Sequence, residues 1–137
     1  MDAAPDQSGR GVLGETGADQ AGQIVEEAAE KLGGLDVLVN NAGVGIGELI
    51  GELTTKKLDI QINTNFRSIP LFYREAMDML KAAGEEHRNA LVVNTSSISG
   101  KRGEAWLSVY SATKHAVIGF TQAMTKELSS AGIKSTA

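Results

Sequence analysis

The sequence of 137 residues contains no cysteine, which excludes a disulfide framework and a thiolate metal site. It carries a formal net charge of −4 and has no basic cluster, so we do not expect a nucleic-acid partner. No stretch approaches the ~20 apolar residues of a membrane span. The N-terminal "MDAAPDQSGRG" lacks the basic region and apolar run of a secretory signal. We therefore expect a cytoplasmic protein without a membrane partner.

Histidine is also scarce, and neither His87 nor His115 has a partner at metal-ligand spacing. We expect no metal site, and we interpret both histidines as structural or solvated. Hydrophobic residues make up 42% of the chain, enough for the core of one domain. Residues 1–18 show no hydrophobic period and predict a flexible lead-in, which leaves residues 19–137 as the domain.

Helical and strand patterns alternate along residues 19–137. The first helix is predicted from Asp19 to Leu32, with Gly33 and Gly34 as its stop. The β-branched run "LDVLV" then predicts a buried strand that ends in Asn40-Asn41-Ala42-Gly43.

A helical region capped by Thr54 or Thr55 follows and extends to Ala83 in one or two pieces, with a bend or break at Pro70. A second strand, "ALVVNTSS", precedes a helix that begins near Tyr110 and reaches Ser130. Gly132 should stop this helix, and "IKSTA" predicts a third strand. The alternation indicates an α/β fold with a parallel sheet, in which ligands bind outside the carboxyl ends of the strands.

Two residues near the start of the last helix can form an acid–base pair. Tyr110 and Lys114 are four residues apart, so they lie on the same helical face. A free phenol is a poor acid–base catalyst at neutral pH, but a cation within ~4–6 Å favours its ionised form. Taken alone, however, the pair is also compatible with an ordinary amphipathic helix.

Four motifs together resemble the short-chain dehydrogenase/reductase family, in its compact single-domain branch. They are "NNAG" at 40–43, "TNFRSI" around Asn65, "VVNTSS" ending at Ser97, and "YSATK" from Tyr110 to Lys114. Their order and spacing match the family over residues 19–137. The resemblance implies a partial Rossmann-like, doubly wound parallel sheet that represents the central part of the family's fold.

The resemblance also implies a role for each residue. Tyr110 would be the acid/base, Lys114 its electrostatic partner and a ribose ligand, Ser97 the substrate-orienting hydroxyl, and Asn65 a relay residue that holds a water. Asn63 is the alternative to Asn65. The cofactor would be NAD or NADP, bound by Asn40, Ala42, Gly43, Tyr110 and Lys114. The substrate would be a small carbonyl or alcohol, and the full-length protein would form dimers or tetramers.

The dinucleotide-binding glycine motif has no convincing counterpart in the chain. Residues 9–14 fit G-x-G-x-x-G but follow no strand, and "TGADQAGQ" from Thr16 misses the family's glycine spacing. We interpret both as part of the flexible lead-in. We therefore expect a fragment of the family with weak cofactor affinity and with "LDVLV" as an exposed apolar edge.

Several alternatives stay open at this point. The chain is either an oxidoreductase or a truncated, non-catalytic fragment that binds no cofactor. A sugar-nucleotide epimerase shares Tyr-x-x-x-Lys, although "NNAG" favours the compact branch. A serine hydrolase is disfavoured because Ser97 and Ser99 lack the G-x-S-x-G elbow. Trp106 and Leu107 either line a substrate pocket or serve in packing or a subunit contact.

Overall fold

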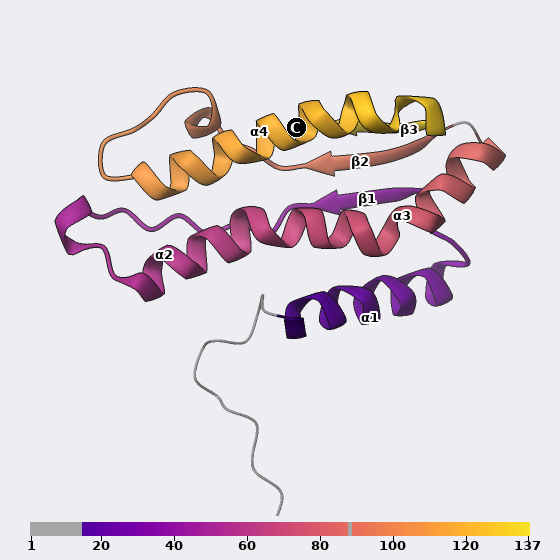
Figure 1. The fold of residues 1–137 in the computed structure, drawn as a ribbon, viewed down its shortest axis with the longest axis horizontal. Coiled ribbons are helices and arrows are strands. Elements are labelled where there is room, and N and C mark those ends of the chain that lie inside the picture. The colour runs from indigo at the N-terminus through magenta and orange to yellow at the C-terminus, as the bar shows by residue number, and fades with distance from the viewer. Residues whose placement is uncertain (1–14, 88) are drawn as a thin grey trace, which may run out of the picture.

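The structure is a computed structural model that describes residues 15–87 and 89–137 (Figure 1). Helices and strands alternate as predicted. In chain order they are α1 (Glu15–Leu32), β1 (Val37–Asn40), α2 (Thr55–Ile62), α3 (Ser68–His87), β2 (Ala90–Asn94), α4 (Ser108–Leu128) and β3 (Ile133–Thr136). No helix of the described part is long and apolar enough to cross a bilayer.

The three strands form one parallel sheet in the order β1-β2-β3, which confirms the predicted α/β class. Val37 pairs with Leu91, and Ala90 pairs with Ile133. The helices connect the strands, as the long crossover of a parallel pair requires. Strand β1 lies at one edge of the sheet, as predicted for "LDVLV".

One face of the sheet carries the hydrophobic core. Along β2, buried Ala90 and Val92 alternate with half-buried Leu91 and Val93, so the two pairs face opposite sides of the sheet. The buried pair belongs to one cluster with Leu80 of α3 and with residues of α4 and β3 such as Val117 and Ile133. Helices α3 and α4 therefore cover the same face, and α1 packs beside α3 (Figure 1).

The start of α1 differs from the prediction. The helix begins at Glu15 rather than near Asp19, so residues 15–18 are helical and are not part of a flexible lead-in. The "TGADQAGQ" stretch thus lies in a helix, whereas the G-x-G-x-x-G match at 9–14 lies outside the described residues. The predicted glycine stops are confirmed, because Gly33 and Gly132 have φ values of 78° and 71°.

The predicted two-piece helix is confirmed, and the break lies just before Pro70. Thr54 Oγ1 accepts a hydrogen bond from Lys57 N and caps α2, and a π-helical turn at Asn63–Arg67 separates α2 from α3. A proline ring clashes with the carbonyl four residues earlier, here that of Phe66, in a regular helix. The wider turn relieves this clash, and such turns are frequent at functional sites.

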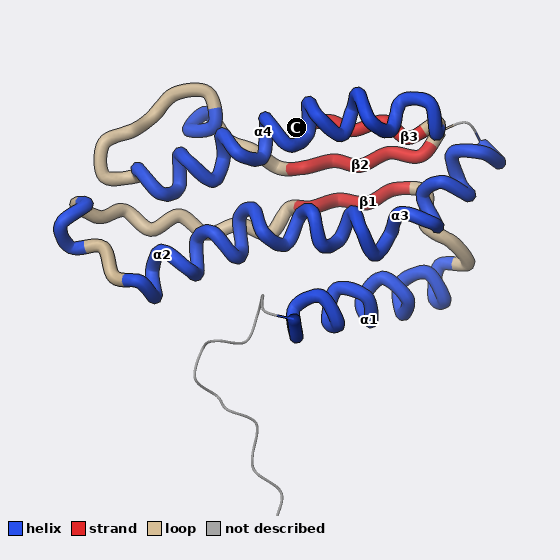
Figure 2. The backbone as a smooth tube through the Cα atoms, viewed as in Figure 1, coloured by secondary structure: helices blue, strands red, loops and turns tan. Residues whose placement is uncertain are grey.

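Two loops meet at one end of the molecule. The loop after β1 spans residues 41–54, and the loop after β2 spans residues 95–107. Figure 1 shows both beyond the arrowheads of β1 and β2, and Figure 2 shows them in tan beside the first turns of α4. All the residues predicted for the site lie in these loops, in the π-helical turn, at the end of β1, or in the first turns of α4.

Candidate active site

Tyr110 and Lys114 lie in the first two turns of α4 and face each other. Lys114 Nζ is 5.7 Å from the centroid of the Tyr110 ring, within the range of a cation–π contact. Tyr110 is half-buried, and its hydroxyl makes no hydrogen bond with any described residue. The phenol thus has a cation beside it and an unused hydroxyl group.

Lys114 is a buried cation, with 3% of its surface exposed. Its Nζ donates a hydrogen bond of 2.9 Å to the carbonyl of Thr95, at the carboxyl end of β2. Ser96 Oγ donates to the Lys114 carbonyl at 3.0 Å and ties the same strand end to α4. No carboxylate of the described residues lies within 4.0 Å of Nζ. An ammonium has three donor protons, so Lys114 keeps two for other acceptors.

The backbone at Gly43 leaves open the space beside this ammonium. A methyl group added at Gly43 would lie 3.3 Å from Lys114 Nζ and 3.6 Å from Asn65 Oδ1. Ala42 and Gly43 are exposed, whereas Asn40 is half-buried and donates to Asn94 Oδ1 at 2.9 Å. Of the predicted cofactor residues, Gly43 therefore lies beside Lys114, and Asn40 binds the neighbouring strand.

Asn65 is fully buried in the π-helical turn, at 1% exposure. Its Oδ1 accepts from Val44 N at 2.7 Å, and its Nδ2 donates to Val44 O at 2.8 Å and to Thr113 Oγ1 at 3.1 Å. Thr113 Oγ1 in turn donates to Tyr110 O at 2.7 Å. The side chain of Asn65 therefore clamps the loop after β1 against α4. Its predicted water-holding role stays a prediction.

Ser97 lies in the loop after β2, where it caps the 3-10 turn Ile98–Gly100. Its Oγ accepts from Ser99 N at 3.2 Å, and no hydrogen bond joins it to Tyr110 in the part of the chain described. A methyl group at Gly100 would lie 2.7 Å from Lys114 O, so this glycine lets the turn pack closely on α4. The structure thus places Ser97 on the element adjacent to Lys114.

The loop after β1 reaches the Tyr110 ring. A methyl group at Gly45 would lie 3.6 Å from two ring carbons of Tyr110. Two backbone amides of this loop are held from outside it: Ile46 N donates to Gln61 Oε1 at 3.2 Å, and Glu48 N donates to Trp106 O at 2.7 Å. The loop therefore forms one wall beside the phenol.

Trp106 immediately precedes Leu107 and α4, and its carbonyl accepts the hydrogen bond from Glu48 N. Its side chain is exposed, and its φ of 66° is rare for a residue other than glycine. Trp106 is not packed in the core of this chain, which leaves the pocket and subunit-contact interpretations. His115 is exposed and its Nδ1 lies 2.8 Å from Ser111 O, as for a structural or solvated side chain. The side chain of His87 lies outside the described part.

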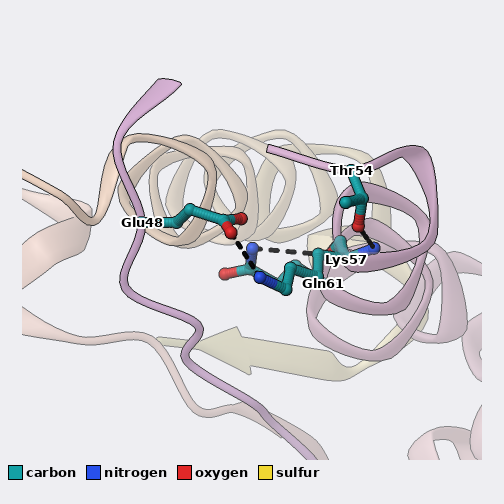
Figure 3. A network of polar contacts seen from close by, with 4 residues as sticks. All are labelled: Glu48, Thr54, Lys57 and Gln61. Carbon is teal, nitrogen blue, oxygen red and sulfur yellow. Dashed lines mark hydrogen bonds and ion pairs between the residues drawn. The ribbon is translucent and has the colours of Figure 1, made fainter. Parts of the chain in front are cut away.

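The sequence interpretation missed several residues that build the site or hold the loops around it. Thr113 carried a signal, since threonine three residues after Tyr110 on a helix can bond its carbonyl. Thr95 acts through its backbone carbonyl, which no side-chain motif reveals. Lys57 and Glu48 form an ion pair across nine positions of chain without a common helix, so no periodicity indicates the contact (Figure 3).

Comparison with known proteins places this geometry in a family. The model of the short chain dehydrogenase family matches residues 15–137. The chain belongs to this family. The family match and the parallel sheet confirm the predicted resemblance and its Rossmann-like fold class.

Curated relatives and solved structures agree with the family match. The chain is 34% identical to the 3-oxoacyl-(acyl-carrier-protein) reductase of Thermotoga maritima, over 90% of this chain and 48% of that protein. It is 33% identical to the 3-ketodihydrosphingosine reductase of Bacteroides thetaiotaomicron, over 85% of this chain and 42% of that protein.

Among solved structures, a metagenomic short-chain oxidoreductase in complex with NADP superposes with a TM-score of 0.78 and 27% identity, over 87% of this chain and 52% of that chain. The short-chain dehydrogenase chain therefore spans about half the length of the curated relatives it matches.

Proposed function

We propose that this short-chain dehydrogenase chain carries the proton-transfer site of an NAD(P)-dependent oxidoreductase. The reaction interconverts a carbonyl and an alcohol, and Tyr110 moves the proton at the substrate oxygen. The observation that carries the proposal is the buried Lys114 ammonium, which lies against the Tyr110 ring and has no carboxylate partner among the described residues.

Lys114 would perform two tasks from this position. Its ammonium lies beside the phenol that would exchange a proton with the substrate oxygen. Its two remaining protons point to an acceptor-rich ligand, and ribose hydroxyls beside Ala42 and Gly43 meet that need. Bound NAD(P)H would supply the hydride. The complexes of related structures with NADP support this choice of cofactor.

Ser97 and Asn65 would act around the phenol. The Ser97 hydroxyl would turn from its own capping bond toward the substrate oxygen and hold it near Tyr110. Asn65 would hold the loop after β1 in place through Val44 and hold the relay water by its backbone. The two curated relatives described above are named as reductases of 3-oxo or 3-keto compounds, which supports a 3-keto substrate.

The second candidate function is a fragment without catalysis or cofactor binding. It is favoured by one observation, the match to only about half of each curated relative. If the chain is such a fragment, no variant of Tyr110 changes a turnover rate, whereas the first candidate predicts that Tyr110→Phe lowers it.

The test compares Tyr110→Phe with Tyr73→Phe in carbonyl-dependent NAD(P)H oxidation. We expect Tyr110→Phe to lower turnover by about 10²-fold or more, as removal of an acid/base group does, and to leave the melting temperature unchanged. Tyr73 bonds Asn94 and Ser135 in the core, so Tyr73→Phe should lower the melting temperature and retain turnover. Equal turnover of Tyr110→Phe and wild type would contradict the proposal, and absence of turnover in wild type would favour the fragment.

A further inference from the structure

Glu48 is an unusual acidic residue, because it is buried in a loop and lies outside the proposed acid–base site. Its side chain is 10% exposed, and Lys57 Nζ of α2 binds its Oε1. Its Oε2 is buried and has no hydrogen-bond partner, the one such side-chain atom in the described part of the chain. A buried carboxylate is costly unless it is paired, so the Lys57 contact holds it in the loop.

Lys57 is itself fixed by α2. Its backbone amide donates to Thr54 Oγ1, the cap of the helix, and its carbonyl accepts from Gln61 Nε2 at 3.4 Å. Gln61 also binds the amide of Ile46 through its Oε1. Figure 3 shows Glu48 reaching from its loop to Lys57, and Gln61 bound to Lys57 one turn further along α2. Helix α2 therefore holds the loop at two points, Ile46 and Glu48.

The backbone amide of Glu48 holds the segment before α4. The Glu48 amide donates to the carbonyl of Trp106 at 2.7 Å. Trp106 has a φ of 66°, a backbone conformation that residues other than glycine rarely adopt. It persists only where the surroundings fix it. The described contacts that fix this residue are the bond from Glu48 and the bond from Leu107 N to Glu104 O.

We propose that Glu48 and Lys57 form a clasp that holds the Trp106 segment against the loop wall beside Tyr110. In this arrangement they are positioning residues, and they set how well the site receives its substrate rather than the proton transfer itself. This effect on substrate rests on the proposed function, whereas the clasp itself does not. Breaking the Glu48–Lys57 contact frees the Trp106 segment and loosens the wall.

The test uses the cofactor-free chain and the fluorescence of Trp106, the sole tryptophan of the sequence. Glu48→Gln and Lys57→Met should each lower the steady-state anisotropy of Trp106 and increase its quenching by acrylamide. The double variant should show no more than either single one, because both break the same contact. Glu52→Gln and Lys56→Met, at exposed neighbouring positions, serve as matched controls and should behave as wild type.

Kinetics with a 3-keto ester and NADPH give the second readout. We expect KM for the ester to rise about three- to five-fold in the two clasp variants, with kcat changed less than about two-fold. If wild type shows no turnover, the proposed function fails and the anisotropy alone decides on the clasp. If Tyr110→Phe abolishes turnover but folded clasp variants keep wild-type anisotropy and KM, the clasp is wrong and the proposed function stands.

Salt provides a version of the test that needs no folded variant. Lys57 is 43% exposed, so salt should weaken its contact with Glu48. Raising NaCl to about 1 M should therefore lower the Trp106 anisotropy of the wild-type chain. An anisotropy that is independent of salt in wild type, together with unfolded clasp variants by far-UV circular dichroism, would overturn the clasp.

Discussion

At the scale of single residues, the site is built around the Lys114 ammonium. The described part of the protein supplies only some of the hydrogen-bond partners that this cation can bind. Lys114 is buried, yet it has one hydrogen bond and no carboxylate within 4.0 Å among the described residues. Burial of a charge is unfavourable unless partners compensate it. The Tyr110 ring compensates part of this charge, and an oxygen-rich ligand would compensate more. A lysine with a purely structural role would more simply be exposed to solvent or paired with a carboxylate.

Asn65 permits a prediction about stability. Asn65→Ala removes three hydrogen bonds and leaves the amide and carbonyl of half-buried Val44 without their Asn65 partner. We expect the free energy of unfolding to fall by about 2–3 kcal/mol in urea denaturation.

Asn63→Ala is the matched control, two residues earlier in the same π-helical turn. Asn63 is half-buried, and its side chain makes no hydrogen bond with the described residues. Its substitution should change the free energy of unfolding by less than about 0.5 kcal/mol. If both variants lost the same stability, Asn65 would not be the clamp of the loop.

The residue types of the site were predictable, but their local partners were not. The proximity of Tyr110 and Lys114 follows from helical spacing, and the structure places the Lys114 ammonium over the Tyr110 ring. Asn65 was preferred to Asn63 on the residues that follow it; the structure buries Asn65 and leaves Asn63 half-buried, and the relay role stays a prediction. The bonds through Thr95 O and Val44 N–H involve the backbone, and their geometry arises only when the loops meet. A sequence pattern carries no information on such contacts.

At the scale of elements, two glycines allow α3 and the turn before β3 to touch. A methyl group at Gly84 of α3 would lie 2.3 Å from Ala131 O, and one at Gly132 would lie 2.7 Å from Gly84 O. Backbone atoms cannot move aside as a flexible side chain does. The end of α3 is therefore fixed against the turn that delivers β3 to the sheet.

Gly84→Ala should consequently destabilise the chain, although alanine is a better helix former than glycine. We expect a loss of about 2 kcal/mol or more in the free energy of unfolding. Gly119→Ala, at an open position of α4, should instead raise stability by about 0.5–1 kcal/mol. Thermal melts of the two variants beside wild type measure both effects. A stabilising Gly84→Ala would show that the close contact does not exist.

Element types were predictable because the hydrophobic period and the glycine stops agree along most of the chain. Three strands, the break near Pro70 and the stop at Gly132 are as predicted. The start of α1 was placed too late because Thr16, Gly17 and Asp19 are weak helix formers, and packing of α1 on α3 outweighs that preference. The π-helical form of the break could not be predicted, since it depends on how Phe66 and Pro70 fit together.

At the scale of the whole molecule, β1 is an apolar edge strand that no other strand of the described residues pairs on its outer side. Val37 and Val39 of β1 are 50% and 58% exposed. They are in register with Leu91 and Val93, so these four side chains share the sheet face opposite α3 and α4. Edge strands with exposed apolar side chains promote association with other chains.

We therefore expect the chain to self-associate. Size-exclusion chromatography at increasing concentration should show species larger than the 14.4 kDa monomer. Val39→Lys should shift the distribution toward the monomer, because a lysine on an edge strand disfavours pairing. Lys134→Arg, on the opposite edge strand β3, keeps the charge there and should leave the distribution unchanged. A sharp monomer peak at all concentrations would contradict this expectation.

The central claim is that this short-chain dehydrogenase chain transfers a hydride to a carbonyl carbon with Tyr110 as the proton donor. The most direct measurement is incubation with a 3-keto ester and NADPH that carries deuterium at C4, followed by mass spectrometry of the alcohol. With wild type, we predict one deuterium in the product from one of the two C4 positions, and almost none with Tyr110→Phe. An alcohol without deuterium, or equal labelling by wild type and Tyr110→Phe, would contradict the account.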